Sequence, residues 1–86
     1  MITKQLMHDI ITFCNNYIDN KNIILSITKY STYLSINFNV WTTNNDVIQN
    51  CIGSLFSYIY NIDDFKYFKQ KILKELPKLL EQVKEK

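Results

Sequence analysis

The central stretch of the chain, residues 22–41, has the clearest alternation of apolar and polar side chains. Apolar residues occupy the odd positions from Ile23 to Ile27 and the even positions from Leu34 to Val40. A period of two is typical of strands that bury one face. We therefore expect two strands that form one β-hairpin, against which the other elements pack.

The register of this hairpin follows from placing both apolar sets on one face, because a slip of one residue would turn one set outward. The pairs that satisfy this condition are Ile27 with Ile36, Leu25 with Phe38, and Ile23 with Val40. The turn must then hold an even number of residues, either Ser31 and Thr32 alone or the whole of 30–33. We favour the longer loop, because Ser and Thr disfavour the positive φ of a tight hairpin turn.

The opposite face of the hairpin carries no charge. Its side chains are Ile24, Ser26, Thr28, Tyr30, Tyr33, Ser35, Asn37, Asn39 and Trp41. The centres of protein interfaces are depleted in charge and enriched in Tyr and Trp, so a partner-binding surface is expected here. The residues expected to contact the partner are Tyr30, Tyr33, Ser35, Asn37, Asn39 and Trp41. The alternatives are an ordinary solvent face and a face covered by the last helix.

Helical periodicity predicts a first helix over residues 4–18 and a second over about 44–60. Thr3 can cap the first helix. The polar run at 42–46 has the composition of a turn followed by a helix start. Because the second helix has an unusually wide apolar stripe, we expect it to be the central helix of the fold.

A third helix begins near Asp63 and Asp64, where a helix N-terminus favours negative charge. Pro77 interrupts its periodicity, and a proline inside a helix predicts either a kink or a fresh short helix. The sequence therefore predicts one α+β domain over residues 1–86. Its order is a helix, a two-stranded antiparallel hairpin and then two helices, the last kinked at Pro77.

Composition narrows the class of protein. Apolar residues make up 47% of the 86 residues and charged residues 21%, which excludes a disordered chain and suits one small domain. No apolar run approaches the roughly 20 residues that span a bilayer, and no signal peptide precedes the first helix. We therefore expect a cytoplasmic protein with no membrane contact.

Three side chains are candidates for chemistry, His8, Cys14 and Cys51. They are too few, and at no recognisable spacing, for a zinc site, and no nucleophile or orienting partner accompanies His8. We expect His8 to be solvated and both cysteines to be reduced thiols on the apolar faces of separate helices. The sequence therefore predicts no catalysis, no metal and no cofactor.

The net charge of +2 comes from ten Lys against eight acids, with no Arg. Arg is the preferred residue for bidentate phosphate and guanine recognition, so nucleic acid is not the expected partner. The alternative is a small nucleic-acid-associated protein whose last helix follows a phosphate backbone. Its contact residues would be Lys66, Lys71, Lys74 and Lys78. Against it, Glu75, Glu81 and Glu85 interleave with these lysines, which is typical of a solvated helix face.

The order helix, strand, strand, helix, helix in a chain of this size resembles that of small proteins that neutralise a larger enzyme by occluding its surface. Such proteins include bacterial immunity proteins of polymorphic toxin and contact-dependent inhibition systems, and phage anti-defence inhibitors. The resemblance concerns the class and transfers no residue. It implies a non-catalytic domain of antitoxin type that binds one protein partner, a toxin or another larger enzyme. A homodimer through the unpaired hairpin edge is the other expected assembly.

Overall fold

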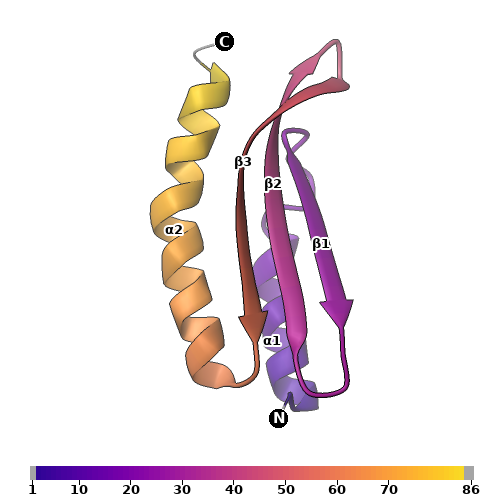
Figure 1. Cartoon of the computed structure of the whole chain (residues 1–86), viewed down its shortest axis with the longest axis vertical. Helices are drawn as coiled ribbons and strands as arrows, with labels where there is room; N and C mark the ends of the chain where they lie inside the picture. The colour runs from indigo at the N-terminus through magenta and orange to yellow at the C-terminus, as the bar shows by residue number, and fades with distance from the viewer. Residues whose placement is uncertain (1, 85–86) are drawn as a thin grey trace.

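A three-stranded antiparallel sheet with two helices on one of its faces forms the structure, a computed structural model that describes residues 2–84 (Figure 1). The elements are α1 (Lys4–Asn15), β1 (Ile23–Lys29), β2 (Leu34–Asn44), β3 (Val47–Ile59) and α2 (Ile62–Lys84). The strand order is β1-β2-β3, so each strand lies beside the next along the chain. In Figure 1, α2 runs beside β3, while α1 lies behind β1 and β2.

The predicted hairpin is confirmed as β1 and β2. The register pairs Ile27 with Ile36, Leu25 with Phe38, and Ile23 with Val40. The loop between the strands spans 30–33, and Tyr30 N donates a hydrogen bond to Tyr33 O over 2.8 Å. The burial of alternating residues in β2 was therefore enough to fix which strand residues face each other.

The second predicted helix is wrong, because residues 47–59 form β3. The polar run before it is a hairpin turn rather than a helix cap. Asn45 and Asp46 have φ of 53° and 63°, and Asn44 pairs with Val47 across them. Positive φ at both central residues is the signature of a two-residue turn that matches the twist of paired strands. The fold therefore has three strands and two helices, not a two-stranded hairpin with three helices.

Residue preferences explain why this segment is extended. It consists mainly of β-branched, aromatic and small polar residues, with one Leu and no Ala, Glu or Lys. The β-branched and aromatic residues lose rotamer freedom in a helix but pack well on a pleated sheet, and Ser and Asn disfavour a helix by bonding the local backbone. Local preference and the turn therefore outweigh the apparent helical stripe. Cys51 consequently lies exposed on a strand instead of in a helix core.

The two helices are close to expectation. Thr3 Oγ1 accepts a hydrogen bond from Leu6 N at 3.0 Å, but α1 ends at Asn15 rather than at residue 18. At the start of α2, Asp64 N donates to Asn61 Oδ1, and Asp64 Oδ2 accepts from Tyr60 N. Because α2 continues through Pro77, no new helix begins there, and the kink remains a prediction. Within residues 2–84, neither helix is long and apolar enough to cross a membrane.

The core lies between the helices and one face of the sheet. Its buried side chains are Leu6, Ile10, Cys14, Ile23, Leu34, Ile36, Phe38, Val40, Leu55, Ile59, Phe65, Phe68, Ile72 and Leu76. Phe38 is at the centre, since its ring contacts Tyr17 and Phe68 with centroids 5.3 and 5.8 Å apart. Both helices use this face, so the opposite face of the sheet has no helix over it.

Candidate functional site

The face of the sheet away from the helices is the candidate site, and we call it the open sheet face. On the β1 side it carries Ile24, Ser26, Thr28 and Tyr30. On β2 and the residue before it, it carries Tyr33, Ser35, Asn37, Asn39 and Trp41. On β3 and the residue after it, it carries Ser54, Phe56, Tyr58 and Tyr60. None of these side chains is charged. The interpretation of this face as one covered by the last helix is wrong, because α2 packs on the other side of the sheet.

Five aromatic rings form a continuous cluster at one end of the open sheet face. The ring of Tyr33 stacks on Tyr30 and on Tyr60, with centroids 4.7 and 5.0 Å away, and meets Tyr58 edge-on at 5.5 Å. Phe56 extends the cluster through an edge contact with Tyr58 at 4.9 Å. These contacts join the rings of three segments into one cluster.

The rings remain open to solvent although they contact one another. Tyr30, Phe56, Tyr58 and Tyr60 are between 44% and 50% exposed. Single exposed apolar residues are ordinary, but several contiguous ones indicate a contact surface. The cluster is therefore an exposed, partly apolar patch with hydroxyl groups on it.

The six residues predicted as contacts all lie on this face, but they contribute unequally. Tyr30 is exposed, whereas the other five are half-buried. Asn39 Oδ1 accepts a hydrogen bond from Ser54 Oγ of the neighbouring strand. The Nε1 of Trp41 and the Oδ1 of Asn37 are buried without a protein hydrogen-bond partner among the described residues. Those two polar atoms are therefore not presented at the surface.

Sequence reasoning missed three of the five cluster residues, namely Phe56, Tyr58 and Tyr60. It had assigned them to a helix spanning about 44–60. The available signal was the alternation from residue 53 onward, with aromatic side chains at even positions and the buried Leu55 and Ile59 at odd positions. A strand that carries apolar residues on both faces hides this period.

The electrostatics of the cluster favour a neutral hydroxyl at Tyr33. Desolvation raises the pKa of Tyr33 above its usual value, and the adjacent phenols Tyr30, Tyr60 and Tyr58 raise it further. A raised pKa means that the neutral form of Tyr33 persists to higher pH in the folded chain.

The alternative set of lysines does not form a comparable surface. Lys66, Lys74 and Lys78 are exposed on α2, but Lys71 Nζ donates to Phe56 O at 3.2 Å and so ties α2 to β3. Lys78 Nζ lies 3.9 Å from a Glu75 carboxylate oxygen. One of the four ammonium groups is thus held against a strand backbone and another lies beside an acid.

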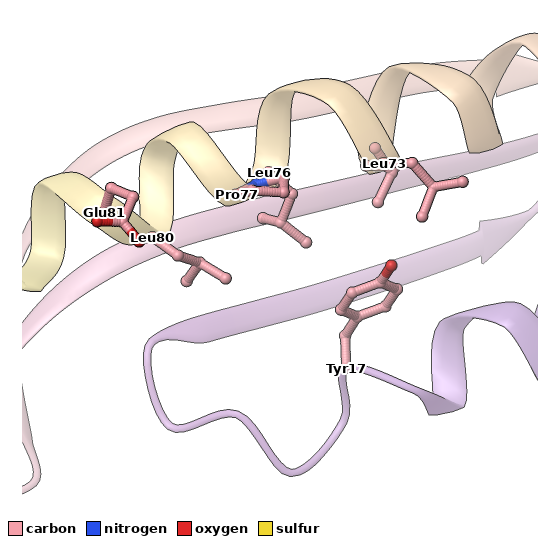
Figure 2. Close-up of a pocket in the computed structure, with 7 residues that line it drawn as sticks. Tyr17, Leu73, Leu76, Pro77, Leu80 and Glu81 are labelled. Atoms are coloured by element: carbon pink, nitrogen blue, oxygen red, sulfur yellow. The ribbon is translucent and has the colours of Figure 1, made fainter.

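A shallow apolar groove lies on the helix side of the sheet, between α2 and the segment after α1 (Figure 2). In Figure 2, the Tyr17 ring points from that segment toward α2. The groove has a volume of about 220 Å³, and its lining is Tyr17, Ile72, Leu73, Leu76, Pro77, Leu80 and Glu81. It is smaller than typical ligand sites of about 300–1,000 Å³, and Glu81 is its only charged residue.

The other chemical candidates are dispersed. His8 is exposed on α1, Cys14 is buried and Cys51 is exposed on β3, and both cysteines are free thiols. Among residues 2–84, no group of three or more His, Cys, Asp or Glu side chains could hold a metal ion. Comparisons of the chain with protein-family models, with curated protein sequences and with solved structures found no match.

Proposed function

We propose that this chain is a non-catalytic binding domain that attaches to one larger protein through its open sheet face. The observation that carries the proposal is the aromatic cluster of Tyr30, Tyr33, Phe56, Tyr58 and Tyr60. These rings contact one another, and four of them are about half exposed. Truncating such anchors in an interface typically costs 2 kcal/mol or more of binding free energy.

The remainder of the open sheet face supports a protein as the partner. Around the cluster, the face offers Ser, Thr and Asn side chains. Tyr with Ser and Asn is the composition of antibody binding surfaces, where rigid rings supply contact area and short polar groups supply adaptable hydrogen bonds. A nucleic-acid surface would add cations to follow the phosphates, and this face has none.

The expected mode of action is occlusion. Because the open sheet face presents exposed rings on the outside of the sheet, it is suited to cover part of a partner rather than to enclose a small ligand. Occlusion needs no reacting group in this chain, which agrees with its scattered His and Cys side chains. We propose that the partner, a toxin or another larger enzyme, loses access to its own substrate when covered.

The test starts from affinity purification of the tagged chain from cells that express it naturally, followed by titration of the purified partner in a calorimeter. Phe56→Ser and Tyr58→Ser should each weaken binding by about 10- to 100-fold, because each removes a hot-spot ring. Both side chains are near 50% exposed, so circular dichroism should show an intact fold.

The matched control is Tyr67→Ser on α2. Tyr67 is 70% exposed and lies outside the open sheet face, so its loss should leave the affinity at the level of the unmodified chain. Equal weakening by Tyr67→Ser, or full affinity after loss of Phe56 and Tyr58, would show that the partner binds elsewhere. Retardation of labelled DNA or RNA at low salt would instead favour the lysines of α2.

A further inference from the structure

The outer edge of β1 has no neighbouring strand among residues 2–84, because the strand order is β1-β2-β3. Trp41 N donates to Asn22 O at 2.7 Å, and Tyr30 N donates to Tyr33 O. In an antiparallel strand, every second residue directs its N–H and C=O groups to the same neighbouring strand. The even-numbered residues of β1 therefore face β2, and Leu25 and Ile27 direct their N–H and C=O groups to the free edge.

This edge lacks the usual protection against pairing. β1 contains no proline, and its one charged residue, Lys29, lies at the end of the strand. Natural sheets protect free edges with proline, bulges, inward charges or a covering element. At the other edge of the sheet, α2 runs beside β3, and Lys71 Nζ donates a hydrogen bond to Phe56 O. The contrast makes β1 the edge that is available for pairing.

We propose that β1 pairs antiparallel with β1 of a second copy of this chain, about a two-fold axis at Ser26. This register places Leu25 opposite Ile27 of the second copy and Ile27 opposite its Leu25. Leu25 and Ile27 direct their backbone groups outward, so each Leu25–Ile27 pair exchanges backbone hydrogen bonds. The N–H of Ile23 takes no part, because it donates to Asn20 O of its own chain at 3.1 Å. The Lys29 side chains lie at opposite ends of the pairing, each across from Ile23, and do not meet.

The same register buries apolar surface that the single chain leaves open. Ile27 is 37% exposed on the helix side of the sheet. Ile11 is 43% exposed on the flank of α1 away from Phe13, whose ring contacts Phe65 of α2. That flank therefore faces the β1 side of the molecule. In the dimer, these isoleucines approach the corresponding side chains of the second copy, as a self-complementary interface requires.

The expected size of the interface sets the expected strength. The seven residues of β1, at about 3.3 Å each, give an edge of about 23 Å. A sheet and a helix layer are together about 20 Å thick. Multiplied by the length of the edge and counted on both copies, this thickness gives roughly 900 Å² of buried surface. This is at the low end for specific interfaces, so we expect a weak dimer that dissociates on dilution.

The test is the mass in solution, measured by sedimentation velocity and light scattering from about 1 to about 200 µM, a range that brackets a weak interface. The unmodified chain should shift from monomer to dimer with concentration. Ile27→Lys places a charge at the centre of the pairing and should remain monomeric. Ile24→Lys is the control, because Ile24 lies on the same strand, is also 37% exposed, and points to the open sheet face. It should dimerise like the unmodified chain.

A second measurement needs no substitution. The backbone amides of Leu25 and Ile27 should exchange with solvent more slowly as the concentration of the unmodified chain rises, whereas the amide of Thr28, which faces β2, should not change. A monomer at every concentration, a dimer that survives Ile27→Lys, or amide exchange independent of concentration would overturn the proposal. The open sheet face stays exposed in this dimer, so the proposed protein-binding function stands or fails separately.

Discussion

The turn between β2 and β3 decides whether residues 47–59 pair as a strand, and substitution at Asp46 tests this directly. Asp46 has φ of 63° and follows Asn45 at 53°. A non-glycine residue in this region costs about 1–2 kcal/mol, less for Asn and Asp and more for a β-branched residue. Asp46→Val should therefore destabilise the fold by about 1–2 kcal/mol through the backbone alone.

A competing explanation is the ion pair of Asp46. Its Oδ1 lies 3.2 Å from Lys21 Nζ, but the two side chains are 77% and 68% exposed. Pairs this exposed contribute about 0.2–1 kcal/mol, and salt screens them. Asp46→Gly removes the pair but relieves the backbone cost by a similar amount, so its free energy of unfolding should lie within about 0.5 kcal/mol of the unmodified chain. Lys21→Met removes the pair without touching the turn and should cost about 0.5 kcal/mol or less.

Urea unfolding followed by circular dichroism separates these effects, at concentrations low enough to keep the chain monomeric. The expected order of stability places Asp46→Gly close to the unmodified chain, Lys21→Met slightly below it and Asp46→Val lowest. If Asp46→Gly lost as much stability as Asp46→Val, backbone conformation would not be the controlling factor. The reasoning that makes Asn45 and Asp46 the origin of the third strand would then be refuted.

Two further predictions concern the packing of the helices on the sheet. A Cβ at Gly53 would lie 2.8 Å from Leu79 Cδ2, the end of a flexible side chain that must move aside. Gly53→Ala should therefore stabilise the unmodified chain less than a Leu79→Ala background, where the methyl group has room and glycine's backbone entropy is removed. Equal effects of Gly53→Ala on urea unfolding in the two backgrounds would contradict this contact. Burial raises the pKa of the Cys14 thiol from 9.0 to about 11. Between pH 9 and 11 the thiol therefore keeps its proton in the folded state and loses it in the unfolded state, so the free energy of unfolding should fall as the pH rises. The fall should be less steep in Cys14→Val. Parallel pH profiles of the two proteins would contradict the raised pKa of Cys14.

The part of the fold that could be predicted from sequence is the part in which pattern and residue preference agree. In β1 and β2, apolar residues alternate with mostly small polar ones, and only one register places both apolar sets on the same face. At α2, the acids after Asn61 and the three- and four-residue spacing of apolar side chains indicate the same start and the same buried face. For each of these elements, the period of the apolar residues and the residue preferences indicate the same structure.

Where pattern and preference disagreed, the pattern was misleading. Residues 44–60 have an apolar stripe that fits a helix, yet their composition fits a strand. Val47, Ile48, Phe56 and Tyr58 are all exposed, so the apolar residues of β3 do not mark its buried face. A period of two is weak when both faces of a strand are apolar, and a helical pattern then fits the same residues.

This failure and the candidate site have one physical cause. A strand on the surface of an isolated domain normally carries polar side chains outward, which makes its period visible and keeps it soluble. β3 carries Phe56 and Tyr58 outward, where they join Tyr33 in the aromatic cluster instead of entering the core. Rings kept at about half exposure gain little for the stability of this chain, because only surface removed from water contributes hydrophobic free energy. The placement of these rings is explained if binding of a partner removes their remaining exposure. The strand that is hardest to predict from sequence, β3, is then also the one that carries the evidence for the proposed function.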